Sequence, residues 1–222
     1  MKTSSKILSI ILFLFFGFSY AHAQSFGISL KIKENDADRI SHLASDQRDL
    51  LREMYKNGTI KDMYIKSDDI GQYKVRTFRL VLQSENVEEA KEIISSLPMV
   101  KSGEMKLDNI VVVGEKWLDN TPLNNNYGLT FTWKDDIELM EIDRVLGIDL
   151  QEIITLNQVG TVSSSFINIQ EFESKRSKRP TYLISILAKD EQQANMISQK
   201  FESVRLGYAD VTIVHMGRKF EF

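Results

Sequence analysis

Cysteine is absent from this chain of 222 residues, which also has only three prolines and three histidines. Without thiols the chain has no disulfide, no thiolate nucleophile and no cysteine-based zinc site. His22 falls in the N-terminal segment treated below, so only His42 and His215 are left for chemistry. A histidine-rich metal site and a Ser-His-Asp triad are therefore disfavoured, and we predict neither a metal nor a cofactor.

Long runs of one charge are also missing, and the formal net charge is only −3. Nucleic-acid binding needs clustered Lys and Arg side chains. The short basic run at 175–179 is better interpreted as a solubilising hairpin tip. Beyond residue 23 no apolar run approaches the roughly 20 residues of a membrane-spanning helix. We therefore predict no nucleic-acid partner and, after loss of the N-terminal segment, no membrane association.

The N-terminus has the pattern of a secretory signal peptide. Lys2 and Lys6 are followed by an apolar run from Ile7 to Phe18 and by the small-x-small triplet Ala21–Ala23. The apolar run is short for a membrane anchor. The sequence thus predicts cleavage of residues 1–23 and an exported chain, periplasmic or secreted, that begins at Gln24.

The remaining residues show two successive βαββαβ patterns. Period-two alternation indicates strands at 26–33, 60–66 and 73–82, an apolar β-branched run indicates a fourth at 107–113, and period-3.6 stripes indicate the two helices between them. The same order returns from Tyr127, with the first strands 101 residues apart (127 against 26) and the second helices 104 apart (190 against 86). The residues at 115–126 hold Pro122 and three asparagines and read as a linker.

The predicted fold class is α+β, with tandem ferredoxin-like halves at 24–114 and 127–222. A four-stranded sheet with helices on one face must cover its other face as well. Two halves placed face to face form a pseudo-dimeric α/β barrel with an interior. Two separate domains that each pair with another copy are the alternative, so both a monomer and a homodimer remain open.

The first half resembles a known superfamily. The segments Leu50–Ile60, Glu89–Ala90 and Ser95–Val100 resemble the dimeric α/β-barrel superfamily, closest to its muconolactone isomerase-like and YCII-like members. The resemblance covers about 26–113 and implies a ferredoxin-like fold with a cavity for a small aromatic or lactone-like compound. No histidine of this half occupies the positions used by YCII-like or haem-degrading relatives, so no catalytic residue is carried over.

Polar residues on the strand faces opposite the helices would point into the barrel. The sequence places Ser29, Lys31, Thr77 and Arg79 there in the first half, and Thr130, Thr132 and Ser185 in the second. We predict Arg79 as a two-pronged carboxylate ligand, and Lys31 and Tyr64 as further ligand-binding residues. The alternatives are an ion pair or a solvent-facing position for Arg79, a surface position for Lys31 and amphipathic packing for Tyr64. His215 is a conceivable general base, although its position beside Val211 and Ile213 favours packing.

From these residues we predict an exported, non-catalytic protein that binds a small acidic or aromatic molecule in the barrel. One alternative is a muconolactone isomerase-like enzyme acting on a cyclic acid or lactone. Another is a module that binds an envelope protein. The catalytic residues, if the chain has any, are left unassigned.

Overall fold

The structure is a computed structural model and describes residues 23–32, 37–70, 73–120, 124–172, 177–220 and 222. The predicted signal peptide lies outside these residues. The first half contains β1 (Gln24–Ile32), α1 (Ala37–Lys56), β2 (Ile60–Ile70), β3 (Tyr73–Ser84), α2 (Val87–Ser96), α3 (Pro98–Lys101) and β4 (Met105–Val112). After β5 (Glu115–Asp119), the second half contains β6 (Asn125–Trp133), α4 (Leu139–Gln158), β7 (Val162–Phe172), β8 (Ser177–Leu187), α5 (Glu191–Ser198), α6 (Glu202–Arg205) and β9 (Ala209–Lys219).

The strands form a nine-stranded antiparallel sheet in the order β4-β1-β3-β2-β9-β6-β8-β7-β5. The predicted α+β class and ferredoxin-like strand arrangement are confirmed. The β2–β9 pairing joins the two halves and sets Tyr64 opposite Lys219. At the other junction, β5 follows the first half and pairs with β7 of the second half.

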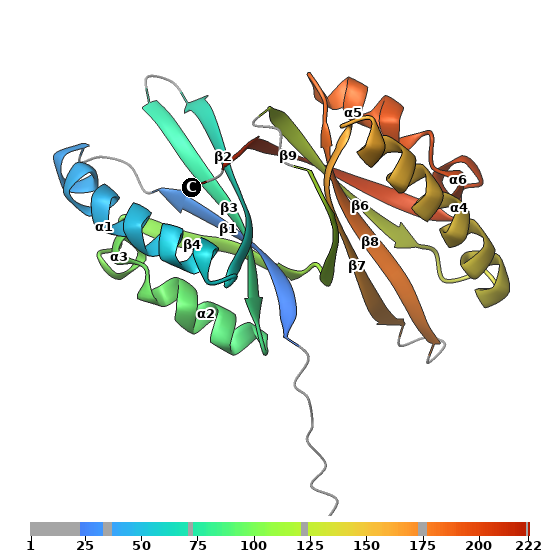
Figure 1. The fold of residues 1–222 in the computed structure, drawn as a ribbon, viewed down its shortest axis with the longest axis horizontal. Coiled ribbons are helices and arrows are strands. Elements are labelled where there is room, and N and C mark those ends of the chain that lie inside the picture. The colour runs from blue at the N-terminus through green and yellow to red at the C-terminus, as the bar shows by residue number, and fades with distance from the viewer. Residues whose placement is uncertain (1–22, 33–36, 71–72, 121–123, 173–176, 221) are drawn as a thin grey trace, which may run out of the picture.

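The helices lie on the outer sides of the two halves, and the sheets face one another between them (Figure 1). Each half has a separate hydrophobic core between its sheet and its helices. Phe26, Leu82 and Ile94 lie in the first core, and Phe131, Tyr182 and Phe201 in the second. A third, smaller cluster of Val81, Val113 and Phe166, with Leu183 packed against it, fills part of the space between the sheets, and a site can occupy only the rest.

The stretch predicted as a linker is partly a strand. Glu115–Asp119 alternates between exposed and half-buried positions and pairs with β7 as β5. The asparagine-rich remainder leads directly into β6, which begins at Asn125. The composition of 115–126 masked this strand because three of the five strand residues are charged and the two apolar residues, Trp117 and Leu118, are adjacent and do not alternate.

Two glycines with positive φ allow the strands to pass closely at the junctions between the halves. Gly114 (φ 81°) lies against the backbone of Ile167 in β7, and Gly217 (φ 89°) lies against the backbone of Ile65 in β2. A Cβ at Gly114 would be 2.0 Å from the Ile167 carbonyl oxygen, and one at Gly217 would be 2.4 Å from the Ile65 carbonyl oxygen. These positions require glycine both for φ and for space.

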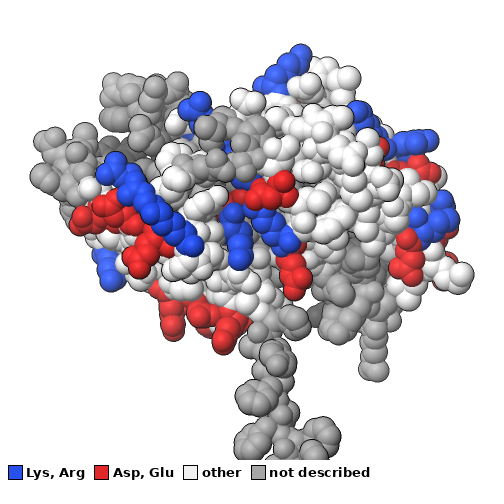
Figure 2. Space-filling view, in the orientation of Figure 1, with Lys and Arg blue, Asp and Glu red and all other residues white. Residues whose placement is uncertain are grey.

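On the face shown in Figure 2, the described Lys and Arg side chains are interspersed with Asp and Glu. That face lacks the continuous basic stripe that binds a phosphate backbone. None of the described helices combines the length and apolarity needed to cross a bilayer.

Candidate functional site

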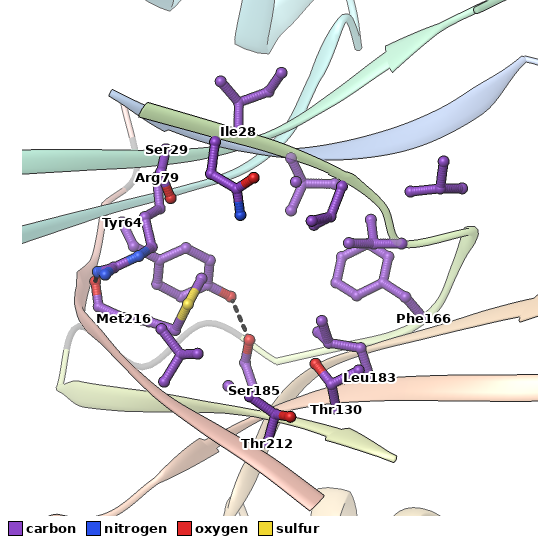
Figure 3. A pocket seen from close by; sticks show the side chains of 18 of the residues that line it. Ile28, Ser29, Tyr64, Arg79, Thr130, Phe166, Leu183, Ser185, Thr212 and Met216 are labelled. Atoms are coloured by element: carbon purple, nitrogen blue, oxygen red, sulfur yellow. Dashed lines mark hydrogen bonds between the residues drawn. The ribbon is translucent and has the colours of Figure 1, made fainter. Parts of the chain in front are cut away.

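A cavity of about 360 Å³ lies between the two sheets. Its wall is mostly apolar, with contributions from β1, β2, β3, β4, β6, β7, β8 and β9. Figure 3 shows Arg79, Tyr64 and Met216 together at one end and Phe166 toward the other. Ser29, Thr130 and Ser185 also line the cavity as the alternation predicts. Such a wall with a few placed polar groups is typical of a small-molecule site.

Arg79 reaches the cavity from β3. Its Nη1 donates to the His215 carbonyl at 2.7 Å, so the side chain bridges the two halves where β9 passes. The residue is half-buried and lines the cavity wall. A guanidinium carries five N–H donors. The cavity therefore has a permanent positive charge at one end, next to an apolar interior.

Tyr64 in β2 is completely buried, and its ring separates the cavity from a polar cluster. Its hydroxyl donates to Ser185 Oγ at 2.9 Å and lies 3.3 Å from Ser164 Oγ. Burial raises the pKa of the Tyr64 phenol far above its usual range, and the neighbouring Asp62 carboxylate raises it further. Tyr64 is therefore a neutral hydrogen-bonding group at neutral pH, not a phenolate.

Lys31 and His215 lie away from this site. The Lys31 ammonium pairs with Asp108 at 2.8 Å, and its side chain is 46% exposed. His215 stacks on the Tyr127 ring with centroids 4.7 Å apart, and its Nε2 is 2.7 Å from Asn125 Oδ1. The contact of His215 with a cavity residue is made by its backbone carbonyl, which accepts the hydrogen bond from Arg79. The structure thus brings Arg79 and Tyr64 together but not Lys31 or His215.

A buried ionic cluster beside Tyr64 was not predicted. The Lys219 ammonium contacts Asp62 Oδ1 at 2.9 Å, Asp119 Oδ1 at 2.8 Å and Ser164 Oγ at 2.9 Å. Lys116 contacts the same two carboxylates at 3.1 and 2.6 Å. Lys219 and Asp62 are 2% and 1% exposed, so this pair is closed to solvent. Together these residues tie the end of β9 to β2, β5 and β7.

Electrostatics within the cluster favour the charged forms. Burial alone would raise the pKa of Asp119, but the hydrogen bonds and charges of Lys116 and Lys219 outweigh it and lower that pKa. Burial alone would lower the pKa of Lys116, yet Asp62 and Asp119 raise it. Among the described residues, no three Asp, Glu or His side chains gather as a metal site.

Comparisons with known proteins show the fold. No family model and no curated protein matches this sequence. A mutant chlorite dismutase from Candidatus Nitrospira defluvii has a TM-score of 0.53 at 7% identity, covering 90% of this chain and 92% of that one. A haem-binding protein from Thermus thermophilus has a TM-score of 0.50 at 11% identity, covering 90% and 94%. The chain thus shares the dimeric α/β-barrel fold of chlorite dismutase-like proteins; a muconolactone isomerase-like or YCII-like relationship stays a prediction.

These comparisons correct two expectations from the sequence. The predicted non-catalytic binding function and the predicted small acidic or aromatic ligand are wrong, whereas export stays a prediction. Proteins that share the fold over nine-tenths of the chain include chlorite dismutases and a haem-binding protein. The aromatic part of that prediction came from a resemblance confined to the first half, the acidic part from Arg79, and the non-catalytic part from the small number of acid-base residues.

Proposed function

We propose that the barrel cavity binds haem or a closely related tetrapyrrole. The observation that carries this proposal is a mostly apolar cavity of about 360 Å³ with the Arg79 guanidinium at one end. A tetrapyrrole has a flat apolar body and carboxylates at one edge, which matches that polarity. The fold shared with a haem-binding protein supports the same ligand class.

The lining residues fit the organic part of haem. Val81, Val113, Phe166 and Leu183 would contact the ring, and Arg79 would hold a carboxylate. The described residues of the lining include no histidine, and the raised pKa of Tyr64 makes its phenol a poor iron ligand. Met216 offers a thioether, a known axial ligand type. Haem, when bound, supplies redox chemistry at its iron, whereas this chain supplies the apolar enclosure and the carboxylate contact.

Arg79→Gln is expected to weaken the binding of protoporphyrin IX about tenfold, because a charge-assisted hydrogen bond contributes roughly 1.5–3 kcal/mol. A fluorescence titration of the full mature chain measures the dissociation constant. Arg218→Gln, at an exposed position of β9, is the matched control and should bind like the wild type. The dimethyl ester of protoporphyrin IX should not distinguish Arg79→Gln from the wild type. Equal affinity of both proteins for the free acid would refute the carboxylate contact.

We propose also that the chain is exported and cleaved before Gln24. The charge, apolar run and small-x-small triplet of residues 1–23 support this. Expression of the full chain in a secreting bacterial host should yield a periplasmic or extracellular protein whose N-terminal sequence starts at Gln24. A cell-associated product that retains Met1 would contradict export.

A tandem, pseudo-dimeric origin of the two halves is proposed as well. The strand orders β4-β1-β3-β2 and β9-β6-β8-β7 are equivalent, which supports it. So do the equivalent helix caps Asn86 and Asp190, and the junction glycines Gly114 and Gly217, 103 residues apart (217 against 114). In this arrangement one chain closes one barrel, and Arg79 and Tyr64 correspond to the apolar Leu183 and Phe166 of the second half. The duplication would thus have produced a cavity with one polar end, at Arg79 and Tyr64, and one apolar end, at Leu183 and Phe166.

A further inference from the structure

Four buried side chains form a continuous hydrogen-bonded row from the ionic cluster to the cavity. Lys219 Nζ donates to Ser164 Oγ at 2.9 Å, Ser164 Oγ lies 3.3 Å from Tyr64 OH, and Tyr64 OH donates to Ser185 Oγ at 2.9 Å. Each of the four residues is at most 2% exposed. Tyr64 and Ser185 line the cavity, whereas Ser164 and Lys219 lie behind them (Figure 3).

Lys219, the first residue of the row, fixes the donor-to-acceptor direction of its hydrogen bonds. An ammonium group has three donors and no acceptor, so Lys219 can only donate to Ser164. The hydroxyl hydrogen of Ser164 is then available for Tyr64. Because Tyr64 remains a protonated phenol, its hydroxyl donates a hydrogen bond to Ser185 Oγ.

Ser185 is therefore the terminal donor. Its Oγ accepts from Tyr64, and no described residue accepts the hydrogen of its own hydroxyl. Successive donors in a row polarise one another and strengthen the last one. A buried donor without an acceptor is unfavourable, so a ligand oxygen placed beside Ser185 would satisfy it.

We propose that Ser185 is a binding residue for an anionic or carbonyl oxygen of the ligand in the barrel, with Ser164 and Lys219 as positioning residues that fix the direction of its hydroxyl. This inference rests on the proposed function, and for a tetrapyrrole the oxygen belongs to a carboxylate. Arg79 and Ser185 then recognise the polar edge of the ligand from β3 and β8, one from each half.

The test is a fluorescence titration of the mature chain with metal-free protoporphyrin IX. Ser185→Ala is expected to weaken binding about tenfold, the loss of one charge-assisted hydrogen bond. Ser164 does not itself line the cavity, and Ser164→Ala is expected to weaken binding about threefold through lost polarisation. Ser198→Ala removes a buried hydroxyl of α5 that does not line the cavity and should leave affinity unchanged.

A double-mutant cycle separates positioning from general damage. In the Ser185→Ala background, Ser164→Ala should have no further effect on affinity, because its only route to the ligand is gone. Ser198→Ala, a fully buried serine of α5 remote from the row, controls for loss of a buried hydroxyl. Independent, additive effects of the two substitutions would overturn the positioning role of Ser164.

The outcomes distinguish the two proposals. Wild-type binding that Ser185→Ala leaves unchanged would overturn the role of Ser185 while keeping the proposed function. Absence of protoporphyrin IX and haem binding by the wild type would overturn the proposed function itself, and with it the assignment of a carboxylate to Ser185.

Discussion

Replacing Lys219 with methionine is expected to lower the free energy of unfolding by about 3 kcal/mol, measured by urea denaturation of the mature chain. Lys219 neutralises Asp62, which is 1% exposed and whose Oδ2 already has no hydrogen-bond partner. Without the ammonium, Lys116 is the one ion-pair partner left to that buried carboxylate among the described residues. Removing one partner of a buried pair leaves an uncompensated charge, and the remaining lysine places the effect at the lower end of the usual 3–5 kcal/mol.

Two further variants test the reason for this loss. Lys189→Met removes a lysine whose side chain is 77% exposed and should change stability by less than about 0.5 kcal/mol. The double variant Lys219→Met/Asp62→Leu should regain at least half of the lost stability, because it removes the unpaired carboxylate too. If Lys219→Met lowers the free energy of unfolding no more than Lys189→Met does, the ionic cluster does not hold the halves together.

The interior face of the barrel could be predicted from strand alternation. In β3 the apolar Phe78 and Leu80 face the helices, so Arg79 between them must face the other sheet. The same argument placed Ser29, Thr130 and Ser185 correctly. Alternation predicts which face of the sheet a side chain is on, but not whether the cavity extends as far along the strand as that residue. Lys31 is on the same face of β1 as Ser29, yet it lies beyond the cavity and pairs with Asp108.

The ionic cluster could not be predicted because its members come from remote parts of the chain. Lys219 and Asp62 are brought together by the β2–β9 pairing, which depends on how the two halves close. Register shifts in β2 and β5 also displace Asp62 and Lys116 from the simple period of two. In the sequence, Lys219 follows Gly217 and Arg218 and looks like part of a solvated C-terminal end.

Gly114→Ala is expected to have the largest effect on stability, a loss of at least about 3 kcal/mol in urea denaturation. Its φ of 81° costs an alanine about 1–2 kcal/mol. The added Cβ would also lie 2.0 Å from the Ile167 carbonyl oxygen and 2.8 Å from Asn168 Cα, which are backbone atoms of β7 and cannot turn aside. Relieving that overlap requires β5 and β7 to separate, which would open the junction between the halves next to the cavity.

Gly103→Ala separates the two contributions to this loss. Gly103 has nearly the same φ, 80°, but its Cβ would meet nothing within 4 Å. It should therefore lose only the conformational part, about 1–2 kcal/mol. Gly217→Ala, with a Cβ 2.4 Å from the Ile65 carbonyl oxygen, should behave like Gly114→Ala at the opposite junction. Equal losses for Gly103→Ala and Gly114→Ala would mean that close strand contact at the junction contributes nothing, and that φ alone accounts for the need for glycine.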